Sequence, residues 1–188
     1  SKEEIFFINS EKEKTKLEKD LKLPGGNFGS GNRNVLDHLV FKDLKDKLNL
    51  ILQDYMNKVV CPADDILPYI TQSWLTFTDP GKLHHEHTHP NSYLSGVVYI
   101  QCHKTLDKIS FVNHEYDLIR PEVREHNIFN SKVWTISVKT NDVILFPSSL
   151  SHFVPPNEGN KTRISLSFNT FIKGTVGLID YATALVLK

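Results

Sequence analysis

The spacing of hydrophobic residues changes once along this chain, close to Pro68. Between about residues 39 and 60 the apolar positions recur every three to four residues and form one stripe, which is typical of an amphipathic helix. Beyond Pro68, apolar and polar residues alternate in short runs with turn residues between most of them, which predicts strands. The expected strands are 69–77, 83–89, 94–101, 108–112, 132–138, 142–146 and 163–171. Helices followed by many short strands indicate an α+β chain whose second part is a β-sandwich or barrel, with the helix packed on one sheet.

The segment before the long helix is less regular. Four apolar residues at 5–8 are expected to form an edge strand. Ser10 with Glu13 has the spacing of a capping box, which would open a charged helix that runs to about Lys22. Residues 23–34 contain one proline and four glycines and therefore predict a loop.

Length and composition fit one cytoplasmic domain. The 188 residues can enclose a hydrophobic core. Lysine plus arginine and aspartate plus glutamate both number 22, so no overall charge favours nucleic acid or an anionic membrane. Two cysteines make no disulfide framework, and neither a signal peptide nor an apolar stretch of about eighteen residues is present. We expect a soluble protein that binds neither nucleic acid nor membrane, and we leave a homodimer open. The expected parts of the domain are a helical N-terminal part (1–68), a strand-rich core (69–175) and a C-terminal extension (176–188).

Histidines gather in one segment and recur at one distant position. His85, His87 and His89 alternate in an extended segment, and His152 lies in what we expect to be a second loop. Imidazole is the commonest neutral nitrogen ligand for Fe, Zn, Ni and Cu. Side chains at positions i and i+2 of a strand point to the same side. One strand can therefore supply two metal ligands and a distant segment the third, with coordination positions left open for substrate or oxygen.

Alternation alone does not fix which pair of side chains on this strand binds the metal. Three pairs have the required spacing: His87 with His89, His85 with His87, and His84 with Glu86 on the opposite face.

Arg163 follows His152 by eleven residues and begins an alternating segment. Ser165, Ser167 and Asn169 share its face, and the intervening residues are apolar. A polar face inside a barrel suits a ligand cavity. Because an arginine can bind a carboxylate through two parallel N–H bonds, Arg163 could orient an anionic ligand beside the metal.

These segments together resemble the 2-oxoglutarate- and Fe(II)-dependent oxygenases, in particular a small bacterial and phage branch of that superfamily. The matching residues, in the same order and with similar spacing, are Trp74, then 87–99, then 142–148 with Leu150, Ser151 and His152, and finally 163–169.

The resemblance implies a double-stranded β-helix, which is a jelly-roll or cupin-like barrel. It also implies Fe(II) held by His87, His89 and His152, and 2-oxoglutarate as co-substrate with its distal carboxylate on Arg163. Ser165 could donate to the same carboxylate, and Tyr99 could reach the cavity with its hydroxyl group. No catalytic residue is assigned beyond the metal ligands. The implied activity is a dioxygenase that hydroxylates an unidentified small molecule or peptide and releases succinate and CO2.

One position departs from the usual pattern, because His89 stands where the superfamily has the aspartate of its His-x-Asp motif. Three neutral imidazoles would leave Fe(II) with its full double charge. Two alternatives therefore stay open: a three-histidine cupin-type enzyme that does not use 2-oxoglutarate, and a non-catalytic barrel whose metal is closed by a fourth ligand such as His85. A 2-oxoglutarate enzyme should have Arg163 facing the metal cavity, whereas a lock onto an acidic side chain would count against the co-substrate.

Overall fold

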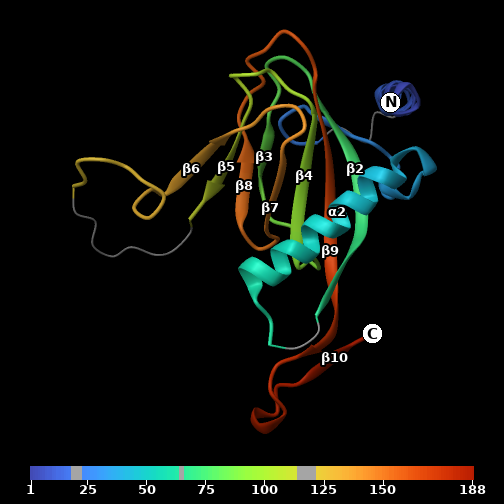
Figure 1. The fold of residues 1–188 in the computed structure, drawn as a ribbon. Helices are drawn as coiled ribbons and strands as arrows, with labels where there is room; N and C mark the ends of the chain where they lie inside the picture. Colours follow the sequence, from blue (N-terminus) through green and yellow to red (C-terminus); the bar gives the residue numbers. More distant parts are fainter. Residues whose placement is uncertain (18–22, 64–65, 114–121) are drawn as a thin grey trace.

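Two antiparallel sheets face each other in the computed structural model, which describes residues 1–17, 23–63, 66–113 and 122–188 (Figure 1). The six-stranded sheet contains β1 (Phe28–Gly29), β2 (Leu67–Thr78), β9 (Arg163–Val176), β4 (Leu94–Gln101) and β7 (Val143–Pro147) in that order, with β10 (Leu185–Leu187) also on β9. The four-stranded sheet has the order β3 (His84–His87), β8 (Ser151–Val154), β5 (Lys108–Val112) and β6 (Val133–Ser137). From β2 to β9 the chain passes repeatedly between the sheets. This winding confirms the α+β class and the double-stranded β-helix.

The last barrel strand, β9, contacts the hydrophobic core with one face and lines a cavity with the other. Leu166 and Phe168 belong to the larger buried hydrophobic cluster, which also contains helix residues. Arg163 and Ser165 line a cavity between the sheets instead. Adjacent side chains of a strand point to opposite faces, so the alternation seen in the sequence produces both surfaces. Gly96 on β4 leaves room for this packing, because a Cβ atom there would lie 2.1 Å from the Phe168 ring.

The long helix expected between residues 39 and 60 is confirmed and lies across the outer face of the six-stranded sheet (Figure 1). It consists of a short turn η3 (Leu39–Phe41), the α-helix α2 (Lys42–Tyr55) and a final wider turn η4 (Met56–Val60). Leu48, Leu52 and Met56 are buried in the same cluster as residues of β2 and β9. The stripe of the helix therefore closes the core on the side away from the cavity.

The N-terminal segment differs from the prediction. Residues 5–8 lie within a helix, α1 (Lys2–Leu17), so both the expected edge strand and the helix start at Ser10 are wrong. The helix begins at Lys2, eight residues before the expected cap Ser10, and the Ser1 hydroxyl accepts a hydrogen bond from the Glu4 backbone N–H at 3.2 Å. Acidic residues in its first turn and lysines in its last turn suit the helix dipole.

Other boundaries also changed. β8 is a strand although the sequence predicted a loop there, and the short strands β1 and β10 were not predicted. The expected helix end at Lys22 lies outside the described residues. The division into parts of one domain stays a prediction. No helix of the described residues is long and apolar enough to cross a membrane.

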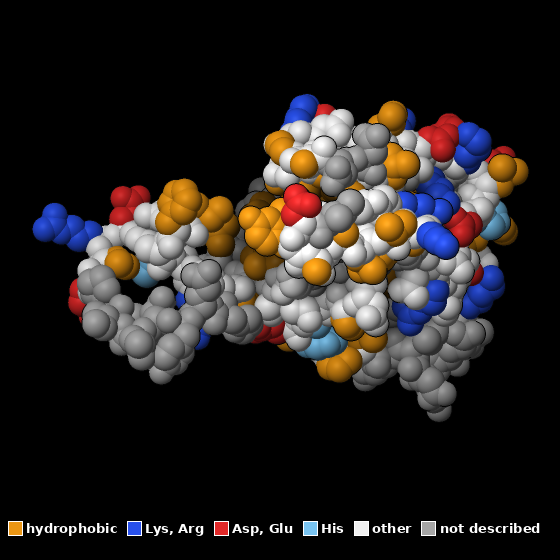
Figure 2. All heavy atoms as spheres, turned by 90° about the horizontal axis from the view of Figure 1, so that it is seen from below, with side chains coloured by type: hydrophobic (Ala, Val, Ile, Leu, Met, Phe, Trp, Pro, Cys, Tyr) orange, Lys and Arg blue, Asp and Glu red, His pale blue; other side chains and the backbone are white. Residues whose placement is uncertain are grey.

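Residues 122–132, which precede β6, project away from the barrel (Figures 1 and 2). Figure 2 shows hydrophobic side chains on this projection and where it joins the body. Phe129 and Ile128 are exposed there, at 93% and 59% of their surface. Residues 122–130, which belong to this projection, are all exposed.

Candidate metal centre

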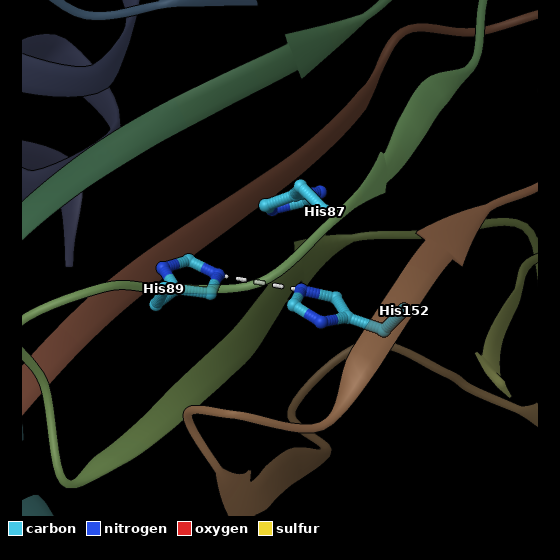
Figure 3. Close-up of side chains that lie close together, drawn as sticks. All are labelled: His87, His89 and His152. Carbon is cyan, nitrogen blue, oxygen red and sulfur yellow. Dashed lines mark hydrogen bonds between the residues drawn. The ribbon is translucent and has the colours of Figure 1, made fainter. Parts of the chain in front are cut away.

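Three histidines converge between the sheets (Figure 3). His87 is the last residue of β3 and lies opposite His152 of β8 in the antiparallel pair. His89 follows two residues later, where its backbone N–H donates to the Ser148 carbonyl at 2.9 Å. Possible ligand atoms of these three side chains all lie within 4.8 Å of one another. His152 thus comes from a strand, and strand pairing, not a loop, fixes its distance from His87.

Backbone carbonyls fix the proton positions on two of the rings. Nδ1 of His87 lies 2.8 Å from the His85 carbonyl, and Nδ1 of His152 lies 3.0 Å from the Leu150 carbonyl. Because a carbonyl oxygen can only accept, Nδ1 carries the proton in each ring and Nε2 keeps its lone pair. Nε2 of His152 lies 3.3 Å from Nε2 of His89 (Figure 3). A cation bound here could take the lone pairs of all three rings.

The surroundings keep these imidazoles neutral. Burial lowers the pKa of His89 to about 3, helped by repulsion from His152 and His87. Burial likewise lowers the pKa of His152 to about 4, against a hydrogen bond to the Leu150 carbonyl that raises it. The pKa of His87 is also lowered, mainly by burial. Neutral imidazole is the form that binds a metal, so the group is ready to bind one near pH 7.

The other residues of β3 do not join the three histidines. The pairing of β3 with β8 shifts register between His84 and His87, so His84 also lines the cavity with its ring centre 4.4 Å from that of His87. His85 lies 3.2 Å from a backbone carbonyl of another segment, and Glu86 accepts a 2.7 Å hydrogen bond from a serine of β8. Among the described residues, no fourth histidine, cysteine or carboxylate completes a closed ligand set.

A narrow cavity connects the histidines with Arg163. Thr76, Tyr99 and Ser165 also line it, and the Trp74 ring stacks on His89 with ring centres 5.8 Å apart. The volume of the cavity is about 30 Å³, which is room for one or two water molecules. A larger ligand therefore enters only if lining side chains move outward.

Arg163 lines this cavity but has an acidic partner. Its Nη1 donates to Oδ1 of Asp107 at 2.8 Å, and the two side chains are only 4% and 2% exposed. Arg163 therefore faces the metal cavity as expected, but it also has the acidic partner that the sequence analysis set as evidence against its role with the co-substrate. Asp107 engages only one terminal nitrogen, because its other oxygen accepts from the His103 backbone N–H at 2.6 Å. Nη2 of Arg163 is buried without a hydrogen-bond partner among the described residues.

Two more polar atoms at the cavity are buried without a partner in the described part of the chain: the Tyr99 hydroxyl and the Thr76 hydroxyl. Burial raises the pKa of Tyr99, so its hydroxyl keeps its proton and can donate. Unsatisfied buried polar groups are rare in folded proteins and call for an explanation. A carboxylate in the cavity would offer acceptors to Tyr99, Thr76 and Nη2 of Arg163 together.

Sequence reasoning did not find Thr76 or Asp107. Thr76 could have been found, because it alternates with Trp74 and Thr78 along β2, and all three line the cavity. Asp107 had no such signal, because it lies in a polar segment 56 residues before Arg163.

The fold and the site together define a jelly-roll barrel with a candidate metal centre of three imidazoles and a buried arginine on the last barrel strand. The sequence model of one family, described as "Putative 2OG-Fe(II) oxygenase", matches residues 72–169, which is more than half of the chain. The chain belongs to this family, whose cofactor is Fe(II) and whose co-substrate is 2-oxoglutarate. No curated protein matches the sequence.

Solved structures agree on the fold. A carbocyclase, SnoK from nogalamycin biosynthesis, is similar with a TM-score of 0.55 at 13% identity, covering 96% of this chain and 81% of that one. A Pseudomonas putida prolyl-4-hydroxylase is similar with a TM-score of 0.53 at 12% identity, covering 86% and 83%. HygX from Streptomyces hygroscopicus, solved with nickel and 2-oxoglutarate bound, is similar with a TM-score of 0.50 at 14% identity, covering 74% and 70%.

Proposed function

We propose that this protein is a 2-oxoglutarate-dependent dioxygenase in which His87, His89 and His152 hold Fe(II). It hydroxylates a second, unidentified substrate and releases succinate and CO2. One observation carries the proposal: three neutral imidazoles and three unpartnered buried donors line the same cavity. The imidazoles would bind a cation and the buried donors would bind an anion, and Fe(II) with 2-oxoglutarate supplies both.

The metal would be held by the Nε2 atoms of His87 and His152 and by one ring nitrogen of His89. Hydrogen bonds from Nδ1 to backbone carbonyls fix two of these rings before any metal arrives. When bound, Fe(II) supplies the redox chemistry that couples oxidation of 2-oxoglutarate by O2 to oxidation of the second substrate. The chain itself supplies ligand geometry, orientation of the co-substrate and a dry cavity.

Arg163 would bind the distal carboxylate of the co-substrate through Nη2, with Tyr99 and Thr76 donating to the same group. A charge-assisted hydrogen bond of this kind is shorter and about twice as strong as a neutral one. Ser165 lines the same cavity and could donate as well. Because the cavity measures only about 30 Å³, entry of a five-carbon diacid must displace lining side chains such as Trp74.

The second substrate would approach from an apolar groove beside the cavity. This groove has a volume of about 970 Å³ and lies between the outer strands β6 and β7, each of which pairs on one side only among the described strands. Phe146 lines both the groove and the metal cavity, and its ring centre lies 4.6 Å from that of His152. A substrate in the groove would thus be separated from the metal ligands by one aromatic ring.

A second candidate is a three-histidine metal enzyme that does not use 2-oxoglutarate. The ion pair between Asp107 and Arg163 favours it, because the pair already satisfies half of the guanidinium. In that case the free nitrogen would bind a carboxylate of the substrate itself. A closed structural metal site has less support, because no fourth ligand joins the three histidines among the described residues.

Anaerobic titration decides between the two candidates. Fe(II) is added first and 2-oxoglutarate second, and the weak visible charge-transfer band of the chelate is followed. We expect the band to appear with 2-oxoglutarate and not with glutarate, which has the same two carboxylates but no keto group to chelate iron. Iron binding without a band, together with no measurable affinity for 2-oxoglutarate, would overturn the co-substrate assignment and leave the second candidate.

A further inference from the structure

We propose that Asp107 is a positioning residue that neutralises Arg163 and repels the distal carboxylate of the co-substrate bound beside it. The inference rests on the proposed function of Arg163. Under it, Asp107 weakens the binding of dicarboxylates while allowing the barrel to fold around a buried arginine.

The contact geometry shows that Asp107 binds only one of the two terminal nitrogens of Arg163. An aspartate can bind both terminal nitrogens of an arginine in a forked pair. Here one oxygen of Asp107 is occupied by the His103 N–H at 2.6 Å, and only the other reaches Arg163. The Asp107 backbone is also fixed, because its carbonyl accepts from the Val138 N–H at 3.0 Å. The carboxylate therefore cannot turn to cover Nη2.

The formal charges of the site sum to zero in both of its states. The three neutral imidazoles contribute none, Arg163 contributes +1 and Asp107 contributes −1, so the metal-free site is neutral. Fe(II) adds +2 and the 2-oxoglutarate dianion adds −2, so the loaded site is neutral again. The usual motif would place a negative charge at the metal, where this chain has His89. In this site the negative charge is on Asp107, beside Arg163. Buried charge that is not compensated is costly, which gives this balance a physical role.

Other charged groups near the pair do not change this count. Lys104 and Lys161 line a second, polar cavity of about 310 Å³ that Arg163 and Asp107 also border. Both lysines are exposed, so water screens their charges, whereas Arg163 and Asp107 are almost completely buried. The balance therefore depends on the buried pair.

Two effects follow if Asp107 is neutralised. The free protein must bury Arg163 with no countercharge, which lowers its stability. The co-substrate, in contrast, no longer meets a carboxylate beside its binding nitrogen. Two like unit charges a few ångströms apart inside a protein repel strongly enough to change affinity by about tenfold or more. The gain should be specific to ligands that have a distal carboxylate.

The test compares Asp107→Asn with the unchanged protein, each loaded with Ni(II) so that no turnover occurs. Calorimetry measures the affinity for 2-oxoglutarate and for 2-oxobutanoate, which can chelate the metal but has no distal carboxylate. We expect Asp107→Asn to bind 2-oxoglutarate about tenfold more tightly and 2-oxobutanoate within about twofold of the original affinity. The matched control is Asp79→Asn, because Asp79 accepts from Thr162, the neighbour of Arg163, and makes no ion pair with Arg163. It should change neither affinity.

The outcomes separate this proposal from the proposed function. If the unchanged protein binds 2-oxoglutarate no more tightly than 2-oxobutanoate, the proposed role of Arg163 fails and the inference fails with it. If the unchanged protein prefers 2-oxoglutarate but Asp107→Asn leaves or lowers that preference, only the role of Asp107 is overturned.

A second measurement covers the case in which Asp107→Asn does not fold. The double variant Asp107→Asn/Arg163→Gln buries no charge, so it should fold and have a higher Tm than Asp107→Asn alone. A double variant that is no more stable than the single one would show that Asp107 does not act through the charge of Arg163.

Discussion

The cavity is lined by two groups of side chains that differ in charge: one is neutral, and the other contains a charge with a buried counterion. The histidine group, with His152 buried and His87 and His89 half-buried, carries no charge, because desolvation keeps each ring in its neutral form. The second group, called the arginine group, consists of Arg163, Tyr99 and Thr76. It keeps the charge of Arg163, because Asp107 is buried beside it. The histidine group thus offers lone pairs to a cation, and the arginine group offers N–H and O–H donors to an anion. A metal chelate with a distal carboxylate fits both groups at once.

The largest expected effect is at the histidine group. Replacing His152 with alanine removes a metal ligand, and loss of even an outer partner of a ligand typically costs about 10- to 100-fold in metal affinity. We expect His152→Ala to weaken Fe(II) binding by at least about hundredfold, measured anaerobically by competition with a coloured chelator. The matched control is His85→Ala, which removes a histidine of the neighbouring strand β3 whose ring lies near a backbone carbonyl outside the group. Equal losses in both variants would contradict the assigned ligand set.

A smaller effect is expected at the arginine group. Arg163→Ala should raise the KM for 2-oxoglutarate about 10- to 100-fold, because a hydrogen bond to a charged group contributes roughly 1.5–3 kcal/mol. Arg163→Lys should recover part of the loss, because lysine supplies the charge without the planar fork. Affinity for Fe(II) should survive both changes. Since alanine leaves Asp107 buried and unpaired, the double variant Asp107→Asn/Arg163→Gln serves as the control for stability. A normal KM in Arg163→Ala would remove this residue from the co-substrate site.

The third effect is a pH dependence of stability, expected from the histidines that line the cavity, His84 included. In the unfolded chain a histidine has a pKa of about 6.5, whereas burial lowers the pKa of His84 and His89 to about 3 and that of His152 to about 4 in the fold. Below pH 6.5 the unfolded chain therefore binds more protons than the folded protein. Stability of the metal-free protein is fully present above about pH 6.5 and should fall as pH decreases toward 4, by up to about 1.4 kcal/mol per pH unit for each such ring.

Urea unfolding between pH 7.5 and 5 measures this dependence. The variant His84→Asn removes one of the titrating rings and keeps all three proposed ligands, so its stability should fall less steeply over the same range. An equal slope in both proteins would show that burial of His84 is not what couples stability to pH.

Strands with clear alternation were predicted well from the sequence, and short elements were not. β4 and β5 have the predicted bounds, because alternating residues and clear turns define both of their ends. The α1 helix was missed because the four apolar residues at 5–8 are too few to distinguish a helical period from an extended one. β8 was missed because it has only four residues and follows a proline and two serines.

In the candidate site, too, some residues could be predicted from the sequence and others could not. His87, His89 and His152 could be grouped from spacing and from the family resemblance, and the structure brings them together. Asp107 could not be found, because its partnership with Arg163 depends on packing between two strands far apart in the chain. The pairing of buried charges leaves no periodic pattern in a sequence.

The pairing of β3 with β8 also has a consequence for how the protein folds. His89 and His152 lie 63 residues apart in sequence, and the strands that join them are the second and second-last pieces of the barrel winding. Contacts over such distances form slowly, because the entropy of closing a long loop is lost before the contact is gained. We therefore expect the metal-binding group to form late in folding, when β3 pairs with β8. A bound ion should therefore lower the unfolding rate and leave the folding rate almost unchanged.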